Sequence, residues 1–482
     1  MNVRRSLMLA GLASNFSTAI GFITSMVLAR LLLPADVGLY SLTASLVGLV
    51  TVIRDFGVSA YVIREPNLDR NKIANAFGLM LVSSWTLAAV VALFRKPLSE
   101  FYGEPGMEGL MLILALNFML IPFGAITLAY LNREMRFGAN FVLTASSALV
   151  NAAVSIALAK YGFGAFSLAW ATLASTFVSV LGSMCFRPAW WPWFPRLRDW
   201  REIASLGLPL TGASLVGQMT SSSTDLIVGR ILGTDSVALL GKAIVMRSLF
   251  EQLVMGAVRV VALPYFSAMQ HNGSELKPIY LSSSRLLTGI GWPFFILLTV
   301  LADPIILLLF GPNWVAASDL IPWVAMSAIM ALPFYLTSSI LTSLGMAGTM
   351  LRSESILLFA KVLIVTATAP LGLQAVAVAL TFVSVGAVLL WGRSLRQAIG
   401  LGPMELLRQQ VGSASLALMT AMTGSLGNVV ADGVSAHPFA HLLIGGAFGV
   451  SGWLLAIAVV RHPLGPELIR ASRKLMKTRP SR

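Results

Sequence analysis

Apolar stretches long enough to cross a membrane follow one another along almost the whole chain. A spanning helix needs about 20 predominantly apolar residues, and by this measure hydropathy predicts about fourteen helices. The predicted spans are residues 7–29, 39–62, 73–94, 109–131, 140–159, 164–186, 203–228, 237–262, 286–309, 318–344, 353–371, 373–391, 411–430 and 441–460. The pattern therefore predicts an all-α polytopic membrane protein.

Composition supports this class. Of 482 residues, 57% are hydrophobic and 11% are charged, which excludes an ordinary soluble domain. Cys185 is the only cysteine, so no intrachain disulfide can form, and structural zinc is disfavoured. Arg4 and Arg5 precede an apolar run that continues to Ala29 without a clear cleavage site, so we expect a retained first helix rather than a signal peptide.

The net charge of +14 comes from basic residues in the short breaks between apolar segments, among them Arg352 and Arg393. If the N-terminus is cytoplasmic, most of these breaks fall on the cytoplasmic side. The outer breaks then hold only Arg30, Arg95, Lys96, Lys160 and Arg230. The positive-inside rule therefore predicts a multi-pass membrane protein with both termini cytoplasmic, and no nucleic-acid partner.

An internal repeat organises the helices. "VLARLLLPADVGLYSL" (27–42) resembles "IVGRILGTDSVALLGKA" (227–243), which places Arg30 and Arg230 at equivalent positions. Such repeats are common in transporters, which bind substrate near the membrane midplane between the two halves. We expect two pseudo-symmetric six-helix lobes plus two C-terminal helices. The predicted divisions are an N-terminal lobe (1–186), a Trp-rich cytoplasmic interfacial linker (187–202), a C-terminal lobe (203–392), a linker with helices 13 and 14 (393–460) and a basic cytoplasmic tail (461–482).

Ionisable residues inside spans are expensive and usually face a cavity or a partner. Bases outnumber acids in the predicted spans, which predicts a hydrated cationic lumen and an anionic cargo. The substrate-binding candidates are Arg54, Lys242, Arg247 and Arg259. The candidates for a polar lumen or for H+ or Na+ coupling are Asn15, Asp55, Gln218, Ser222, Asp225 and Glu251.

Local interpretations accompany several of these residues. Arg247 and Glu251 stand at i, i+4 and are expected to pair. Arg54 and Asp55 point about 100° apart on a helix, so we expect Arg54 to contact cargo and Asp55 to be structural. An alternative interpretation places Lys242 and Arg259 near helix ends, where they snorkel to headgroups, and lets the serines hydrogen-bond between helices.

Signals of catalysis are weak. His437 and His441 are spaced i, i+4, but no carboxylate or cysteine completes a metal site. The longest segment outside the predicted spans has about 20 residues, less than membrane polymerases and glycosyltransferases usually need for their chemistry. We expect no enzyme activity, no catalytic residues, no bound metal and no cofactor; H+ or Na+ coupling is left open.

The turn "ARLLLPADVGLYSL", followed by "IRDFGVSAYVIRE", resembles the signature of bacterial polysaccharide flippases. The resemblance is to the exopolysaccharide and lipopolysaccharide exporter subgroup of the multidrug/oligosaccharidyl-lipid/polysaccharide exporter superfamily. It implies a flippase that moves an undecaprenyl-diphosphate-linked oligosaccharide from the inner to the outer leaflet of the bacterial cytoplasmic (inner) membrane by alternating access. The implied partners are membrane lipids, a polysaccharide polymerase and chain-length or export proteins. No family site residue transfers to Arg247 or Arg259.

Two other functions within the superfamily compete with this interpretation. A multidrug or cation antiporter would favour carboxylates in its cavity, whereas bases outnumber acids in these spans. A peptidoglycan-precursor flippase also has a cationic cavity, so charge alone does not separate it from a polysaccharide flippase.

Overall fold

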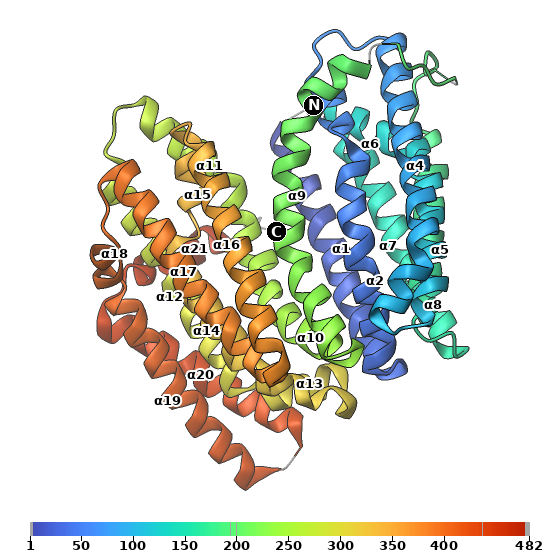
Figure 1. Ribbon diagram of the computed structural model, residues 1–482. Helices are drawn as coiled ribbons and strands as arrows, with labels where there is room; N and C mark the ends of the chain where they lie inside the picture. Colours follow the sequence, from blue (N-terminus) through green and yellow to red (C-terminus); the bar gives the residue numbers. More distant parts are fainter. Residues whose placement is uncertain (1–2, 193, 199, 436, 478–482) are drawn as a thin grey trace. The chain divides into compact units, whose positions relative to one another are not determined.

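The computed structural model describes residues 3–477 except 193, 199 and 436, and it leaves out the side chains of 3–14, 206, 209, 210, 253, 257, 259, 260 and 471–477. The described residues form helices and connecting turns without strands (Figure 1). They divide into two compact units, Met1–Leu239 and Leu240–Arg482. The boundary falls inside helix α10 (Thr234–Phe250).

Unit 1 holds nine helices and the start of α10. They are α1 (Val3–Leu31), α2 (Pro34–Asp55), α3 (Val58–Arg64), α4 (Arg70–Tyr102), α5 (Gly106–Leu120), α6 (Pro122–Arg133), α7 (Phe137–Lys160), α8 (Phe166–Met184) and α9 (Trp200–Ile231). Helix α9 packs against α2, α3 and α4. It therefore contacts helices of the sequence that precedes the linker, although the expected C-terminal lobe begins at residue 203. The expected lobe boundaries stay a prediction.

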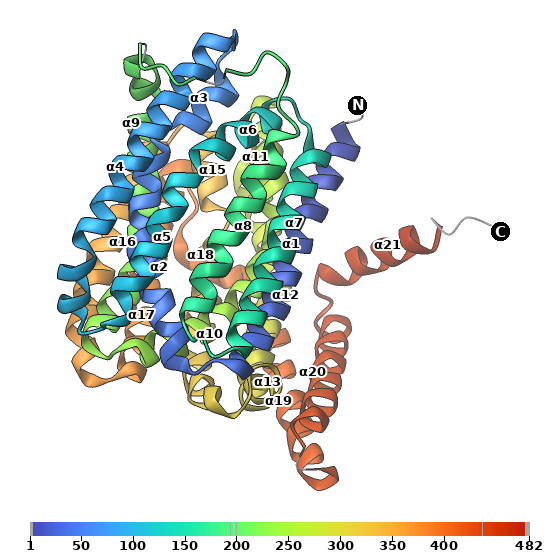
Figure 2. The ribbon, with the colours of Figure 1, turned by 90° about the vertical axis from the view of Figure 1, so that its right-hand side faces the viewer.

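Unit 2 contains the rest of α10 and the following helices. They are the π-helix η1 (Glu251–Met255), α11 (Gly256–His271), α12 (Leu276–Val300), α13 (Ala302–Phe310), η2 (Pro312–Leu320), α14 (Ile321–Ala331), η3 (Leu332–Phe334), α15 (Thr337–Ser343), α16 (Ala347–Thr368), η4 (Ala369–Leu371), α17 (Leu373–Ile399), α18 (Pro403–Gln409), α19 (Val411–Val434), α20 (Pro438–Val460) and α21 (Leu464–Lys477). Helices α19 and α20 lie side by side (Figure 2), with Gly427 and Gly445 in close contact. Small residues let two membrane helices approach in this way.

Within the described residues, ten helices are long and apolar enough to span a membrane, or eleven if the bent pair α5–α6 is one span. The predicted count of fourteen stays a prediction. Within α1, the residues with described side chains form the apolar helix Asn15–Leu31. The expected span 203–228 lies in α9, which carries the polar run Gly217–Asp225, and the expected span 237–262 is divided among α10, η1 and α11.

Some predicted helix bounds were wrong. The expected span 286–309 is α12, which begins at Leu276, followed by the separate α13. The expected span 109–131 bends by 53° between α5 and α6, where Pro122 cannot donate a backbone hydrogen bond. The expected pair 353–371 and 373–391 is present as α16 and α17, separated by η4 and by Gly372 at φ 108°.

The expected span 39–62 was also wrong as a single helix, because it breaks between α2 and α3. Phe56 and Gly57 take positive φ angles of 45° and 71°. A β-carbon on Gly57 would lie 2.2 Å from the Cα atom of Gly207 in α9. The "DFG" stretch therefore ends α2 and brings its backbone against α9.

The two copies of the sequence repeat adopt the same local structure. Helix α1 ends at Leu31 and α2 begins at Pro34, while α9 ends at Ile231 and α10 begins at Thr234. The second copy has Ala238 where the first has Gly38. A β-carbon on Gly38 would lie 1.8 Å from the Thr234 carbonyl oxygen, which explains the glycine of the first copy. Gly38 therefore lets the turn between α9 and α10 pack directly against the start of α2.

The Trp-rich linker is held along α4. The Arg196 backbone N–H donates to the Ala74 carbonyl at 2.9 Å, and a β-carbon on Gly78 would lie 1.9 Å from the Arg196 carbonyl oxygen. Arg187 donates through Nε to Thr127 Oγ1 at 3.2 Å and through Nη2 to the Phe123 carbonyl. The linker is thus part of the packing of unit 1 in addition to any contact it makes with lipid.

Candidate functional site

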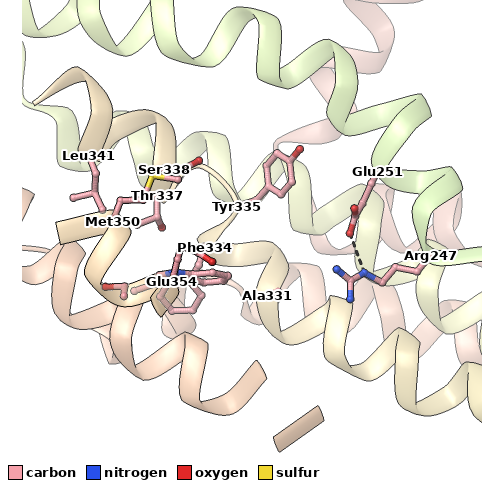
Figure 3. Close-up of a pocket in the computed structure, with 12 residues that line it drawn as sticks. Arg247, Glu251, Ala331, Phe334, Tyr335, Thr337, Ser338, Leu341, Met350 and Glu354 are labelled. Carbon is pink, nitrogen blue, oxygen red and sulfur yellow. Dashed lines mark hydrogen bonds and ion pairs between the residues drawn. The ribbon is translucent and has the colours of Figure 1, made fainter. Parts of the chain in front are cut away.

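A polar and aromatic pocket of about 300 Å³ lies within unit 2 (Figure 3). Arg247 and Glu251 stand on one side, Met350 and Glu354 on the other, and Tyr335 lies between them. The lining residues are Arg247, Glu251, Ala331, Phe334, Tyr335, Thr337, Ser338, Leu341, Met350, Ser353, Glu354 and Trp391. A few polar groups among apolar and aromatic side chains are typical of a ligand site.

The ion pair in this pocket is the one expected from the sequence. Arg247 Nε donates to Glu251 Oε1 at 2.9 Å, and both side chains are a little over one third exposed. Glu251 begins the π-helix η1, which interrupts α10–α11. Insertions of this kind recur at functional sites because they change the direction in which side chains project.

The opposite wall is built on a broken helix. After α14 the chain passes through η3 and an irregular turn at Tyr335 before α15 begins. Buried Tyr280 and Ser284 of α12 donate through their hydroxyls to the Pro333 carbonyl at 3.1 and 3.0 Å. Non-helical backbone is tolerated within a membrane where it lines a cavity or is buried in protein. The segment at Phe334 and Tyr335 lines the pocket, and Phe334 is buried.

Sequence reasoning missed several lining residues. Glu354 is an acid in the first turns of α16, and Tyr335, Ser338 and Trp391 lie in segments that read as ordinary apolar spans. Pro333, which lies one turn before the pocket residues of α15, was the available signal for a broken helix.

In unit 1, Arg54 is a buried cation at the end of α2. Its Nε and Nη1 atoms have no hydrogen-bond partner among the described residues, and its guanidinium carbon lies 6.0 Å from the centre of the Phe118 ring. Ser83 Oγ donates to the Arg54 backbone carbonyl at 2.9 Å, which holds the helix end against α4. Asp55 accepts from Ser59 Oγ at 2.7 Å across the α2–α3 break.

Three further candidates meet α2 in a polar seam. Asp225 Oδ2 accepts from Ser45 Oγ of α2 at 2.7 Å. Gln218 Nε2 donates to Ser222 Oγ at 3.0 Å, and the Gln218 side chain covers Gly48 of α2. The polar run of α9 therefore supplies hydrogen bonds within unit 1.

The remaining candidates lie apart from these clusters. Lys242 is buried, with Nζ 4.6 and 4.8 Å from the centres of the Phe310 and Trp314 rings. Asn15 is exposed. Arg259 lies on α11, but its side chain is outside the described residues. Among the candidates, the structure pairs Arg247 with Glu251 in unit 2, and in unit 1 it gives Arg54 and Asp55 separate surroundings, beside Phe118 and Ser59.

Comparison with known families decides the family. The profile of a family described as "Polysaccharide biosynthesis protein" matches residues 27–319, more than half of the chain. The chain belongs to this family. The matched region contains Arg54, the α9 polar run, Arg247 and Glu251, while the far wall of the pocket, from Ala331 to Trp391, lies beyond it.

Curated relatives carry names from polysaccharide biosynthesis. Succinoglycan biosynthesis transport protein ExoT of Rhizobium meliloti (strain 1021) is 26% identical over 310 residues, which are 64% of this chain and 62% of ExoT. Lipopolysaccharide biosynthesis protein WzxC of Escherichia coli (strain K12) is 20% identical over 334 residues, 67% of this chain and 65% of WzxC. The similarity therefore spans a little under two thirds of each of these relatives.

Solved structures share the fold. A structure titled "Lipid II flippase MurJ, inward closed conformation" matches with a TM-score of 0.79 and 14% identity over 95% of this chain and 99% of that one. An inward-facing multidrug resistance MATE family transporter of the MOP superfamily matches with a TM-score of 0.64 and 16% identity over 81% of this chain and 96% of that one. The chain is thus a multi-pass membrane protein with a MurJ- and MATE-like fold.

Proposed function

We propose that this protein is a flippase that moves a lipid-linked oligosaccharide, carried on undecaprenyl diphosphate, from the inner to the outer leaflet of the bacterial cytoplasmic membrane. The product would serve exopolysaccharide or lipopolysaccharide synthesis. Membership of the polysaccharide biosynthesis family and the transport name of ExoT support this proposal. Alternating access, cytoplasmic termini and cooperation with a polymerase and chain-length proteins are parts of the same proposal.

The pocket around Arg247 is the observation that carries the proposal. Arginine binds phosphate oxygens through a planar group with five N–H donors. In Arg247, the Nε–H donates to Glu251, which leaves the four Nη donors for a ligand. Phe334, Tyr335 and Trp391 offer aromatic faces, and Thr337 and Ser338 offer hydroxyls. A diphosphate attached to sugars would use the Nη donors of Arg247, the flat apolar faces and the hydroxyls. Glu251 and Glu354 line the same pocket, so its carboxylates outnumber its one cation, and the two Nη groups are the donors that Glu251 leaves for phosphate.

Arg54, in unit 1, is a separate candidate for contact with an anionic cargo. Because Nε and Nη1 have no described partner, an anion that reached them would gain charge-assisted hydrogen bonds and relieve a buried charge. Asp55, Asp225 and Glu251 are the candidates to balance these bases or to couple transport to H+ or Na+. Lys242, enclosed by aromatic rings, is a weaker candidate for cargo contact.

The test compares two arginines in similar ion pairs. Arg247→Ala is expressed in a deletion strain beside Arg95→Ala, whose partner pair Arg95–Glu108 has nearly the same exposure but lies outside the pocket. Surface polymer and inner-leaflet lipid-linked oligosaccharide are measured. We expect polymer to fall at least about tenfold for Arg247→Ala, equivalent to about 1.4 kcal/mol, while Arg95→Ala stays near wild type.

Other outcomes identify other functions. Full polymer export with Arg247→Ala would show that the pocket around Arg247 does not take part in transport. Normal polymer but drug sensitivity in the deletion strain would favour the multidrug antiporter, and loss of viability with lipid II accumulation would favour the peptidoglycan-precursor flippase.

A further inference from the structure

A second, smaller pocket of about 170 Å³ lies between the start of α16 and the end of α17. Its lining residues are Thr349, Arg352, Ser353, Ile356, Leu390, Arg393, Ser394 and Gln397. No candidate residue from the sequence falls in it. Ser353 also lines the pocket around Arg247, so the two pockets adjoin.

The charge of this pocket differs from that of its neighbour. Arg352 and Arg393 face one space from two helices, and no carboxylate lines it. Neither arginine forms an ion pair with a carboxylate that the structure describes. Both arginines are exposed, and an anion bound in the space that they line would be stabilised by two positive charges.

The hydroxyl groups complete an anion site. Ser353 and Ser394 are buried, and Thr349 and Gln397 add further hydrogen-bonding groups. The Ser394 hydroxyl donates to the Leu390 carbonyl at 3.0 Å, so Ser353, Thr349 and Gln397 are the donors left for an anion. Arginine pairs hold phosphate oxygens in bidentate geometry, and hydroxyls donate to the remaining oxygens. The apolar pair Ile356 and Leu390 borders the same space and offers contact to a hydrocarbon chain.

The pocket lies at the ends of two candidate spans, six residues into α16 and seven from the end of α17. Because about 20 helical residues cross the hydrocarbon core, the ends of spans of 22 and 27 residues are expected at the level of the lipid headgroups. Basic pockets between transmembrane helices on the cytoplasmic side bind anionic lipid headgroups. The positive-inside pattern predicts that Arg352 and Arg393 lie on that side.

We propose that Arg352 and Arg393 form a binding site for the phosphate group of a membrane lipid. Two lipids share this chemistry: an anionic phospholipid and the diphosphate carrier of the cargo. If the proposed function holds, the second source would make this pocket a docking site beside Arg247, reached past Ser353. The binding itself does not depend on transport.

The experiment measures lipid bound to the purified full-length protein by native mass spectrometry. The probes are cardiolipin, phosphatidylglycerol, undecaprenyl diphosphate and the zwitterionic phosphatidylcholine. Arg352→Gln, Arg393→Gln and the double variant are compared with Arg396→Gln, which removes the same charge from an exposed position of α17 outside the pocket. The single variants keep the test decisive if the double variant does not fold.

We expect each single variant to weaken binding of the phosphate-bearing probes about tenfold and Arg396→Gln to change it less than about twofold. Competition between undecaprenyl diphosphate and cardiolipin identifies the source: displacement of cardiolipin favours the carrier, and its retention favours the phospholipid. Equal losses in Arg396→Gln and the pocket variants, or no loss in any, would overturn the site. Such a result would leave the export test of Arg247 untouched, and a failed export test would leave this binding untouched.

Discussion

Gly57 and Gly207 approach so closely that a β-carbon on Gly57 would lie 2.2 Å from the Cα atom of Gly207. The contact joins the α2–α3 break to α9, two segments separated by some 150 positions of sequence. It places the end of α2, with Arg54 and Asp55, against the helix that carries Gln218, Ser222 and Asp225.

Gly57→Ala is predicted to destabilise the protein by about 2–4 kcal/mol, because the added methyl group meets backbone and a positive φ disfavours a β-carbon. Gly103→Ala is the matched control, since Gly103 has the same φ of 71° and open space around its β-position. Thermal unfolding of the purified protein in detergent measures both. Equal destabilisation would show that the close approach contributes nothing beyond backbone strain.

Arg54→Leu is predicted to raise thermal stability and lower transport. Removing a buried cation with two unpaired nitrogens relieves a desolvation penalty of about 1–3 kcal/mol, whereas the proposed cargo contact is lost. Arg64→Leu, at an exposed position on α3, is the control. Reduced stability together with normal export would show that Arg54 is a structural residue.

Lys242→Met is predicted to reduce stability through the loss of its aromatic contacts. A double-mutant cycle with Trp314→Leu should give a coupling energy of about 0.5–2 kcal/mol, the range for a desolvated cation–π interaction. Export per folded molecule is measured in parallel. If Lys242→Met abolished export without changing stability, Lys242 would instead be a residue that contacts the cargo.

Stability is predicted to depend on pH through His462, which lies just beyond α20. Its Nδ1 accepts from the Leu464 backbone N–H, so Nε2 carries the proton that faces Ser413 Oγ at 3.2 Å. Burial and, secondarily, the nearby Arg285 lower the pKa of His462 to about 4 from an ordinary 6.5. Between about pH 4 and pH 6.5, His462 is therefore protonated in the unfolded chain and neutral in the folded protein.

The contribution of His462 is complete above about pH 6.5 and is lost progressively as the pH falls toward about 4. His462→Gln should flatten the fall of the melting temperature across this window. His271→Gln, at an exposed position, should leave the fall unchanged. An unaltered pH profile in His462→Gln would contradict the assignment.

The class of the protein follows from the sequence without the structure. Long apolar runs leave a chain few options other than membrane helices, because unpaired backbone groups are not tolerated in lipid. Local spacing was equally informative for the Arg247–Glu251 pair, which needs only one helix turn. The turn motif near Arg30 pointed to the polysaccharide family that the comparison then showed.

The residues that share a cavity, and the points at which helices break, follow from tertiary contacts. Glu354 and Trp391 join Arg247 because η1 and the turn at Tyr335 redirect their helices, and no local pattern encodes the meeting of segments so far apart. Arg352 and Arg393, which read as topology signals, share a pocket because α16 and α17 pack antiparallel. Hydropathy depends on each residue's own transfer free energy, whereas a site depends on contacts between distant segments.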